Sequence, residues 1–294
     1  MLDQLAYLAS GIEFPKSGYD KGRRTNIGRS LLHKQQFFLK HPLCCFCGGE
    51  FPAKTIDHIP SRATFTGRRW PVGYEFPACQ RCNSGSSRDE LMIALLARMG
   101  TLNPSEEEIN EFRDLLQGVE NNYPALLEEM RPTANQVRGF LRKRGVRLAH
   151  GQASSDVPVV SVDGPLMRGA IATFARKLFL ALHYKHSGKV VPSGGGVAMK
   201  WITNATSDNS ELLSNIETLR NGLPCAAEMR RSNTGLEDQF SYSYFVNAEG
   251  TFSAYFVIFR QSFLMIGAVR TDAQAFPDVM RGIGMLTPFH VSNP

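Results

Sequence analysis

The chain has 294 residues, of which 43% are apolar and 20% are charged, and this composition excludes a disordered or fibrous protein. No apolar run reaches the roughly 18 residues of a membrane-spanning helix, and the N-terminal segment lacks the basic start of a signal peptide. We therefore expect a cytoplasmic protein outside the membrane, in which closely spaced cysteines bind metal more often than they form disulfides.

Positive charge is concentrated in one part of the chain. Residues 14–88 contain 13 Lys and Arg against 4 Asp and Glu, a net charge of +9, whereas the whole chain carries +6. Such a basic segment attracts the phosphate backbone of a nucleic acid, and this attraction weakens with salt. On charge alone, a basic surface that only keeps the protein in solution is an equally good interpretation.

Three elements are predicted in the first hundred residues. Apolar side chains at helical spacing predict a short helix over 30–40, and a strand is expected over 53–58, ended by Pro60. A stretch rich in N-cap residues then leads into RDELMIALLARM, which predicts a helix from Arg88 up to Gly100. These elements flank and carry a cysteine-rich stretch.

The remaining two thirds of the chain predict a helical segment and then a mixed one. Helices are expected over 104–117, 121–131 and 133–144. Beyond them a long helix is expected over 165–186. Strands are expected over 157–162, 196–203, 240–247, 251–260 and 263–269.

A polar stretch at 150–156 is interpreted as a linker between domains. The expected division is a cysteine-rich domain over 1–100, a helical connector over 101–150 and a C-terminal α+β domain with antiparallel strands over 151–294. The predicted fold class of the whole chain is α+β.

Four of the six cysteines form two C-x-x-C pairs, Cys44/Cys47 and Cys79/Cys82. Four thiolates suit a tetrahedral zinc ion, and a two-residue gap lets one short loop present two sulfurs to one ion. The 31 residues between the pairs exceed the spacing of a simple zinc ribbon, as expected if a functional hairpin is inserted. The alternatives are redox pairs or chance pairs, and Cys45 is a second candidate for the position of Cys44. Cys225 is expected to be a small buried residue.

An Asp-His dipeptide lies between the two cysteine pairs, and an asparagine follows the second pair. Hydrolysis of a phosphodiester needs a base that deprotonates water and a divalent ion that offsets negative charge. His58 can be the base, because the pKa of imidazole lies near neutral pH. Asp57 offers a hard oxygen for Mg²⁺ or Mn²⁺, and Asn83 offers a second, neutral oxygen. Alone, the dipeptide is better explained as a buried hydrogen-bonded pair; the flanking cysteine pairs favour the catalytic interpretation.

Five arginines around these motifs are candidates for contacts to nucleic-acid phosphates: Arg62, Arg68, Arg69, Arg81 and Arg88. Trp70, in the same loop as three of them, is a candidate for stacking on a base. Each arginine taken singly is better explained as a solvated surface residue. As a group on one loop system, they fit a substrate cleft.

The combined motifs resemble the zinc-stapled branch of the HNH endonucleases, which have the ββα-metal fold. The resemblance covers about residues 40–95 and implies that His58 is the general base and that Asp57 and Asn83 hold one catalytic Mg²⁺ or Mn²⁺ ion. It also implies that the four paired cysteines bind a structural zinc ion. This chain departs from the family at Tyr74-Glu75, where an asparagine often helps to position the base.

A second departure is Ser86, where many members of that family carry a lysine. Arg81 and Arg88 are candidates to replace that phosphate contact.

The predicted function is therefore a metal-dependent DNA endonuclease, with RNA as an alternative substrate. The fusion to a large C-terminal module suggests a bacterial defence or restriction-type effector, regulated by a protein partner or by homo-oligomerisation. A zinc-dependent nucleic-acid-binding module without catalysis is the main alternative, and a zinc-stabilised interaction protein is a third.

Overall fold

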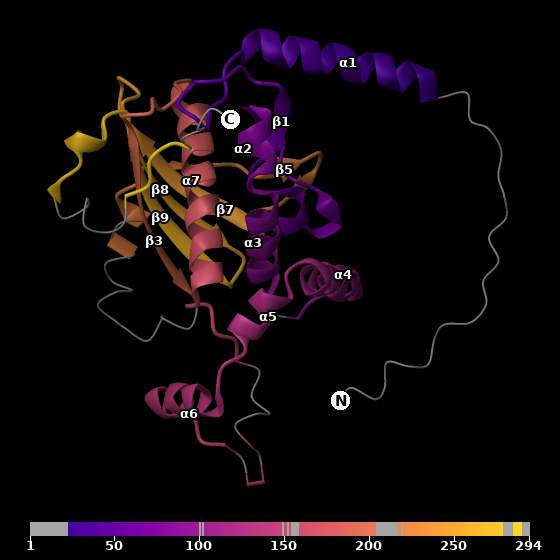
Figure 1. The fold of residues 1–294 in the computed structure, drawn as a ribbon, viewed down its shortest axis with the longest axis vertical. Coiled ribbons are helices and arrows are strands. Elements are labelled where there is room, and N and C mark those ends of the chain that lie inside the picture. The colour runs from indigo at the N-terminus through magenta and orange to yellow at the C-terminus, as the bar shows by residue number, and fades with distance from the viewer. Residues whose placement is uncertain are drawn as a thin grey trace. The chain divides into compact units, whose positions relative to one another are not determined.

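The computed structural model describes residues 23–99, 101, 103–148, 150–151, 153, 159–203, 217–218, 220–278 and 285–289. The chain divides into two compact units, Met1–Lys40 and His41–Pro294. In the first unit, the described residues form helix α1 (Arg23–Lys40), which is longer than the predicted 30–40. All other elements belong to the second unit (Figure 1). Among the described residues, no helix combines the length and apolar character that a membrane crossing requires.

A five-stranded antiparallel sheet forms the largest layer of the second unit. Its strands, in spatial order, are β3 (Gly196–Thr203), β9 (Phe263–Arg270), β8 (Phe252–Phe259), β7 (Phe240–Val246) and β4 (Cys225–Ala226). The four longer strands confirm the antiparallel strands predicted from alternating and aromatic-rich patterns. Asn247 closes the β7–β8 hairpin, because its Oδ1 accepts hydrogen bonds from the backbone N–H groups of Thr251 and Phe252.

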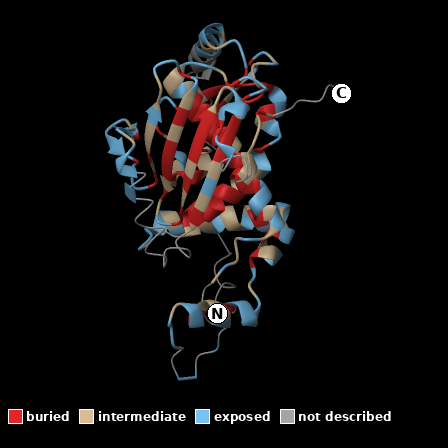
Figure 2. Ribbon diagram, turned by 90° about the vertical axis from the view of Figure 1, so that its left-hand side faces the viewer, coloured by how far each residue is buried: buried red, intermediate tan, exposed pale blue. Residues whose placement is uncertain are grey.

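Helix α7 (Pro165–Ser187) lies across one face of this sheet (Figure 1). Proline suits its first turn, and Gly188 ends it in a left-handed conformation at φ 71°. Phe179 of α7 stacks on Tyr255 with ring centroids 5.9 Å apart. A Cβ atom at Gly267 would lie 2.3 Å from the Phe179 ring, so the sheet needs glycine at this point for the helix to approach. Figure 2 shows buried residues running along the strands of the sheet.

Both cysteine pairs belong to a small unit packed beside α7. Strand β1 (Thr55–His58) pairs antiparallel with β2 (Glu75–Ala78), and helix α2 (Gln80–Ser84) follows directly. We call residues 43–84 the hairpin–helix unit. Helix α3 (Ser87–Met99) comes next and packs along α7.

One hydrophobic core runs through the second unit. Phe46, Ile59 and Phe76 of the hairpin–helix unit belong to the same buried cluster as Phe174 of α7 and Val269 of β9. The predicted division at residues 100 and 150 stays a prediction, and the core extends across both positions.

Three helices lie between α3 and α7. The predicted helical segment contains α4 (Glu106–Asn122), α5 (Pro124–Met130) and α6 (Ala134–Lys143). Capping boxes begin α4 at Ser105 and α6 at Thr133.

Two-residue strands β5 (Arg230–Arg231) and β6 (Thr234–Gly235) pair with each other, and the Arg230 carbonyl accepts a hydrogen bond from Val72 N.

Two expectations were wrong. Residues 159–162, the described part of the strand predicted at 157–162, form no strand. Ser161 N donates to the Met130 carbonyl at the end of α5, and within the described part of the chain no strand pairs with this segment. Cys225 is exposed and not buried, because it lies on the short strand β4 at the edge of the sheet.

Candidate functional site

The four paired cysteines form one cluster. Their Sγ atoms all lie within 4.8 Å of one another, and all four residues are buried. A tetrahedral zinc ion with Zn–S bonds of about 2.3 Å requires sulfurs about 3.8 Å apart. The donor set and its spacing therefore fit a metal ion such as zinc.

Local backbone geometry creates this cluster. Gly48 and Gly49 adopt φ of 71° and 77°, which lets the chain turn sharply after Cys47. Cys79 is the N-cap of α2 and its Sγ accepts a hydrogen bond from Cys82 N at 3.5 Å. The strand β2 and helix α2 thus present the second sulfur pair to the first.

Two of the four thiols share protons with their neighbours. Hydrogen bonds from the thiols of Cys44 and Cys82 lower the pKa of Cys47 to about 4, and hydrogen bonds to Cys44 and Cys47 raise the pKa of the Cys82 thiol. A bound cation would take the place of the shared protons. Cys45 lies outside the four-sulfur group, and burial raises the pKa of its thiol well above the usual value, so it stays protonated.

The hairpin places Asp57 and His58 in different environments. Neighbouring side chains of a strand point to opposite faces, and here Asp57 is 5% exposed while His58 is half-buried. In the β1–β2 register, Asp57 lies opposite Phe76 and His58 lies opposite Glu75. The two predicted catalytic residues are therefore adjacent in the chain but have separate sets of neighbours.

His58 lies among charged and aromatic side chains. Its Nε2 is 2.8 Å from Nη2 of Arg62 and 3.5 Å from Oε1 of Glu75, and its ring meets the Trp70 ring edge-on with centroids 4.8 Å apart. Arginine can only donate, so Nε2 is the unprotonated ring nitrogen. Burial and the Arg62 charge lower the pKa of His58, with Glu75 and Asp57 opposing them. His58 is thus neutral at pH 7, as a general base must be.

Arg62 contacts this histidine, and the charges of two further arginines act on Arg62. Burial and the charges of Arg68 and Arg231 lower the pKa of Arg62, with Glu75 opposing them. Arg62 and Arg231 both contact the Trp70 ring, each with its guanidinium carbon 3.9 Å from the ring centroid. Trp70, predicted to stack on a base, stacks on these two arginines. The result is an electropositive site beside a neutral imidazole, which suits a phosphate group.

Sequence reasoning missed Arg231. Its Nη1 donates to the Trp70 carbonyl at 3.0 Å, and the β5–β6 hairpin carries it to a loop 161 residues earlier in the chain. The Arg230-Arg231 pair was a sequence signal, but no nearby motif connected it with His58.

The other four predicted arginines are exposed. Arg88 lies on α3 with its guanidinium carbon 4.5 Å from the centroid of the Tyr123 ring. Arg81 lies on α2, and Arg68 and Arg69 lie in the loop between β1 and β2. Of the five predicted phosphate contacts, the structure brings Arg62 to His58.

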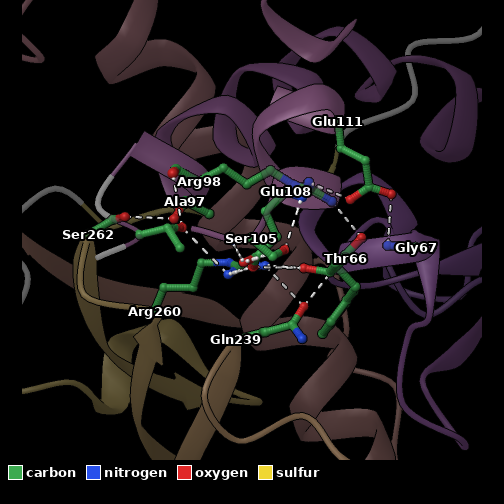
Figure 3. Close-up of polar contacts among 12 residues, drawn as sticks. Thr66, Gly67, Ala97, Arg98, Ser105, Glu108, Glu111, Gln239, Arg260 and Ser262 are labelled. Atoms are coloured by element: carbon green, nitrogen blue, oxygen red, sulfur yellow. Dashed lines mark hydrogen bonds and ion pairs between the residues drawn. The ribbon is translucent and has the colours of Figure 1, made fainter. Parts of the chain in front are cut away.

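A polar network fixes the loop between β1 and β2 (Figure 3). Its partners come from α3, α4 and the β7–β9 segment: Arg98, Glu108, Glu111, Gln239 and Arg260. Thr66 N donates to Gln239 and its hydroxyl to Glu108, while Gly67 N donates to Glu111. Because both residues lie directly before Arg68, the network holds the arginine-bearing loop in place.

Asp57 has no free carboxylate oxygen. Its Oδ1 accepts the backbone N–H of His58 at 2.9 Å, and its Oδ2 is paired with the ammonium group of Lys177. Lys177 Nζ also lies 2.6 Å from Ser86 Oγ and 2.6 Å from Glu90 Oε1. Lys177 belongs to α7 and its side chain is fully buried.

Asn83 does not complete an ion site with Asp57. Among the described residues, its side chain makes no hydrogen bond with Asp57 or His58, and its backbone carbonyl accepts the hydroxyls of Ser86 and Ser87. Mg²⁺ and Mn²⁺ require several oxygen ligands, and the ammonium group held by Asp57 would repel a divalent ion. The predicted Asp57–Asn83 donor set does not fit a divalent ion in this arrangement.

Sequence reasoning also missed the partners of Asp57. Lys177 follows Phe174 by three residues and therefore lies on the apolar face of α7. A charged residue within an apolar stripe was the signal, because a buried charge needs a partner.

Comparisons with known proteins add nothing to this geometry. No protein-family model, no curated protein and no solved structure gave a significant match to this chain.

Proposed function

We propose that this protein is a zinc-stapled endonuclease of the HNH type, which hydrolyses phosphodiester bonds in DNA with His58 as general base. One observation carries the proposal: a neutral, half-buried histidine lies against Arg62 and Trp70, and Arg231 contacts the same Trp70 ring, on a hairpin held by a four-cysteine cluster. The sequence motifs and the strand–strand–helix order of the hairpin–helix unit support the ββα-metal interpretation.

The residues suggest an order of events. The arginines bind the phosphate through charge-assisted, bidentate hydrogen bonds. Arg62 then leaves His58 for a phosphate oxygen, which frees the Nε2 lone pair to accept a proton from the attacking water. The water oxygen bonds to phosphorus while the P–O bond to the leaving oxygen breaks, and that oxygen takes a proton from a solvent water. Glu75, 3.5 Å away, stabilises the imidazolium that forms. The guanidinium charges stabilise the negative charge that develops on phosphate.

The dependence on Mg²⁺ or Mn²⁺ rests on the resemblance alone, and no step above uses such an ion. A role in genome defence, and control by a protein partner or by homo-oligomerisation, likewise stay predictions.

The second candidate function is a zinc-dependent nucleic-acid-binding module without catalysis. The pairing of Asp57 with Lys177 favours it, because it fills the position at which a catalytic ion was predicted. The arginine site beside His58 would then bind phosphate and do nothing more.

Cleavage of supercoiled plasmid by the purified, zinc-loaded protein separates the two candidates. The reactions contain Mg²⁺, Mn²⁺ or buffer freed of divalent ions on a chelating resin, beside the variant His58→Ala. His150→Ala is the matched control, because His150 is exposed and lies far along the chain. The proposal expects nicking by the wild type and by His150→Ala, and none by His58→Ala.

Gel-shift binding completes the test. DNA binding that survives His58→Ala, together with no cleavage by any protein, would establish the binding module and overturn the nuclease. Arg231→Ala is expected to weaken DNA binding. It should also reduce the slope of log K against log salt concentration by about 1, because one phosphate contact is lost. The same assays with a single-stranded RNA decide between the two nucleic acids.

A further inference from the structure

We infer that the Lys177 ammonium group occupies a built-in cation position formed by β1 and the start of α3, so that Asp57 binds no divalent ion while Lys177 is in place. Three oxygens surround Nζ: Asp57 Oδ2 from β1, Ser86 Oγ from the α2–α3 junction and Glu90 Oε1 from the first turn of α3. All three come from the N-terminal part of the second unit. The cation comes from α7, 120 residues after Asp57.

The position is built for a positive charge. Lys177 is fully buried, Asp57 and Glu90 are nearly so, and the Phe46 ring covers Nζ with its centroid 5.1 Å away. An aromatic face attracts a cation, and two carboxylates and a hydroxyl supply the remaining contacts. A buried ammonium group without these partners would be very unfavourable.

The charges within the cluster agree with this assignment. Burial alone would lower the pKa of Lys177, but the carboxylates of Asp57 and Glu90 outweigh it and raise that pKa, so the amine stays protonated. Burial raises the pKa of Glu90, with Lys177 opposing it and Asp57 adding to it. Two carboxyl groups, from Asp57 and Glu90, thus share one ammonium group.

A tethered cation differs from a bound ion in one respect that can be measured. Lys177 cannot exchange, and Mn²⁺ or Mg²⁺ would have to displace it to reach Asp57. Removal of the ammonium group leaves two carboxylates and a hydroxyl facing one position, and such oxygens are the ligands that these ions prefer. This inference holds whether or not the chain cuts DNA.

The test is direct binding of Mn²⁺ to zinc-loaded protein at pH 7.5 without nucleic acid, followed by electron paramagnetic resonance of the free ion. The wild type is compared with Lys177→Met, which keeps the unbranched apolar chain and removes the ammonium group, and with Asp57→Asn. Lys200→Met is the matched control, because Lys200 is exposed on β3. The expected result is no Mn²⁺ site in the wild type or in Lys200→Met, and one Mn²⁺ per chain in Lys177→Met.

Two results would overturn the inference. One is a wild-type Mn²⁺ site that disappears in Asp57→Asn, because Lys177 would then not exclude the ion. The other is a folded Lys177→Met protein, with its zinc and circular dichroism intact, that gains no Mn²⁺ site. If Lys177→Met does not fold, the comparison of the wild type with Asp57→Asn decides by itself.

Discussion

Nη2 of Arg62 lies 2.8 Å from Nε2 of His58, so an arginine covers the lone pair that a general base would use. The contact keeps the imidazole neutral, and it also prevents Nε2 from accepting a proton from water. A phosphate that attracts Arg62 would therefore free the base at the moment when substrate is present.

The protonation of His58 provides the first prediction. In the wild type we expect a pKa below 6.5, because burial and Arg62 disfavour the imidazolium. Arg62→Gln should raise this pKa, since it removes a positive neighbour, and Glu75→Gln should lower it, since it removes a negative one. An NMR titration of the His58 ring protons measures all three values. Shifts of the same sign in both variants would contradict the arrangement.

Metal content provides the second prediction. We expect one zinc ion per chain, released by Cys79→Ser with a fall in Tm, because three remaining thiolates hold the ion weakly and leave a gap in the core. Cys225→Ser should keep the zinc, because Cys225 is exposed and outside the cluster. Atomic absorption of dialysed protein gives the stoichiometry. Full zinc content in Cys79→Ser would show that another ligand replaces Cys79.

The third prediction concerns acid stability. His183 is fully buried, its Nδ1 lies 2.8 Å from Ser253 Oγ, and burial lowers its pKa to about 4. Between pH 6.5 and 4 the unfolded chain binds a proton that the folded chain does not, so stability falls as the pH falls. The loss amounts to roughly 3 kcal/mol over this window.

Urea unfolding at pH 7.5 and pH 5 measures this loss. His183→Leu should lose less stability between the two pH values than the wild type, and His150→Leu should match the wild type. Because loss of zinc at low pH affects all three proteins, only the difference between the variants is interpreted. Equal losses in all three would contradict a neutral, buried His183.

The fourth prediction concerns the network that holds the arginine-bearing loop. Although partial burial opposes ionisation of Glu108, hydrogen bonds from Ser105 N, Arg260 and Thr66 lower its pKa to about 2. Glu108→Gln should lower the free energy of unfolding by about 1–2 kcal/mol at pH 7. This difference from the wild type should disappear as the pH falls from about 4.5 towards 2, because Glu108 is then protonated in the wild type as well. Glu107→Gln, exposed on the same helix, should change stability by less than about 0.5 kcal/mol. Chemical denaturation of both variants provides the comparison.

The sequence predicted those parts of the molecule that depend on local patterns. The two-residue gap within each cysteine pair predicted the four-sulfur cluster, and two strand-like segments on either side of residues 247–250 predicted the strands of the β7–β8 hairpin, because each of these signals is local. The strand expected at 157–162 was wrong for its described part, since an apolar run forms a strand only where another strand pairs with it.

The contacts that define the candidate site could not be read from the sequence. Lys177 meets Asp57 across 120 residues, and Arg231 meets Trp70 across 161 residues. Each pair depends on how α7 and the β5–β6 hairpin pack against the hairpin–helix unit. Local spacing contains no information about that packing.

The distance along the chain between Asp57 and Lys177 has a consequence during synthesis. At about 5–20 residues per second, a ribosome needs on the order of 10 s to add the 120 residues that separate the two. During that interval the nascent hairpin has its cysteines but lacks the cation that neutralises Asp57 and Glu90. The hairpin therefore stays open to water until α7 emerges, and the strands of the five-stranded sheet, which pack on the other side of α7, are made later still.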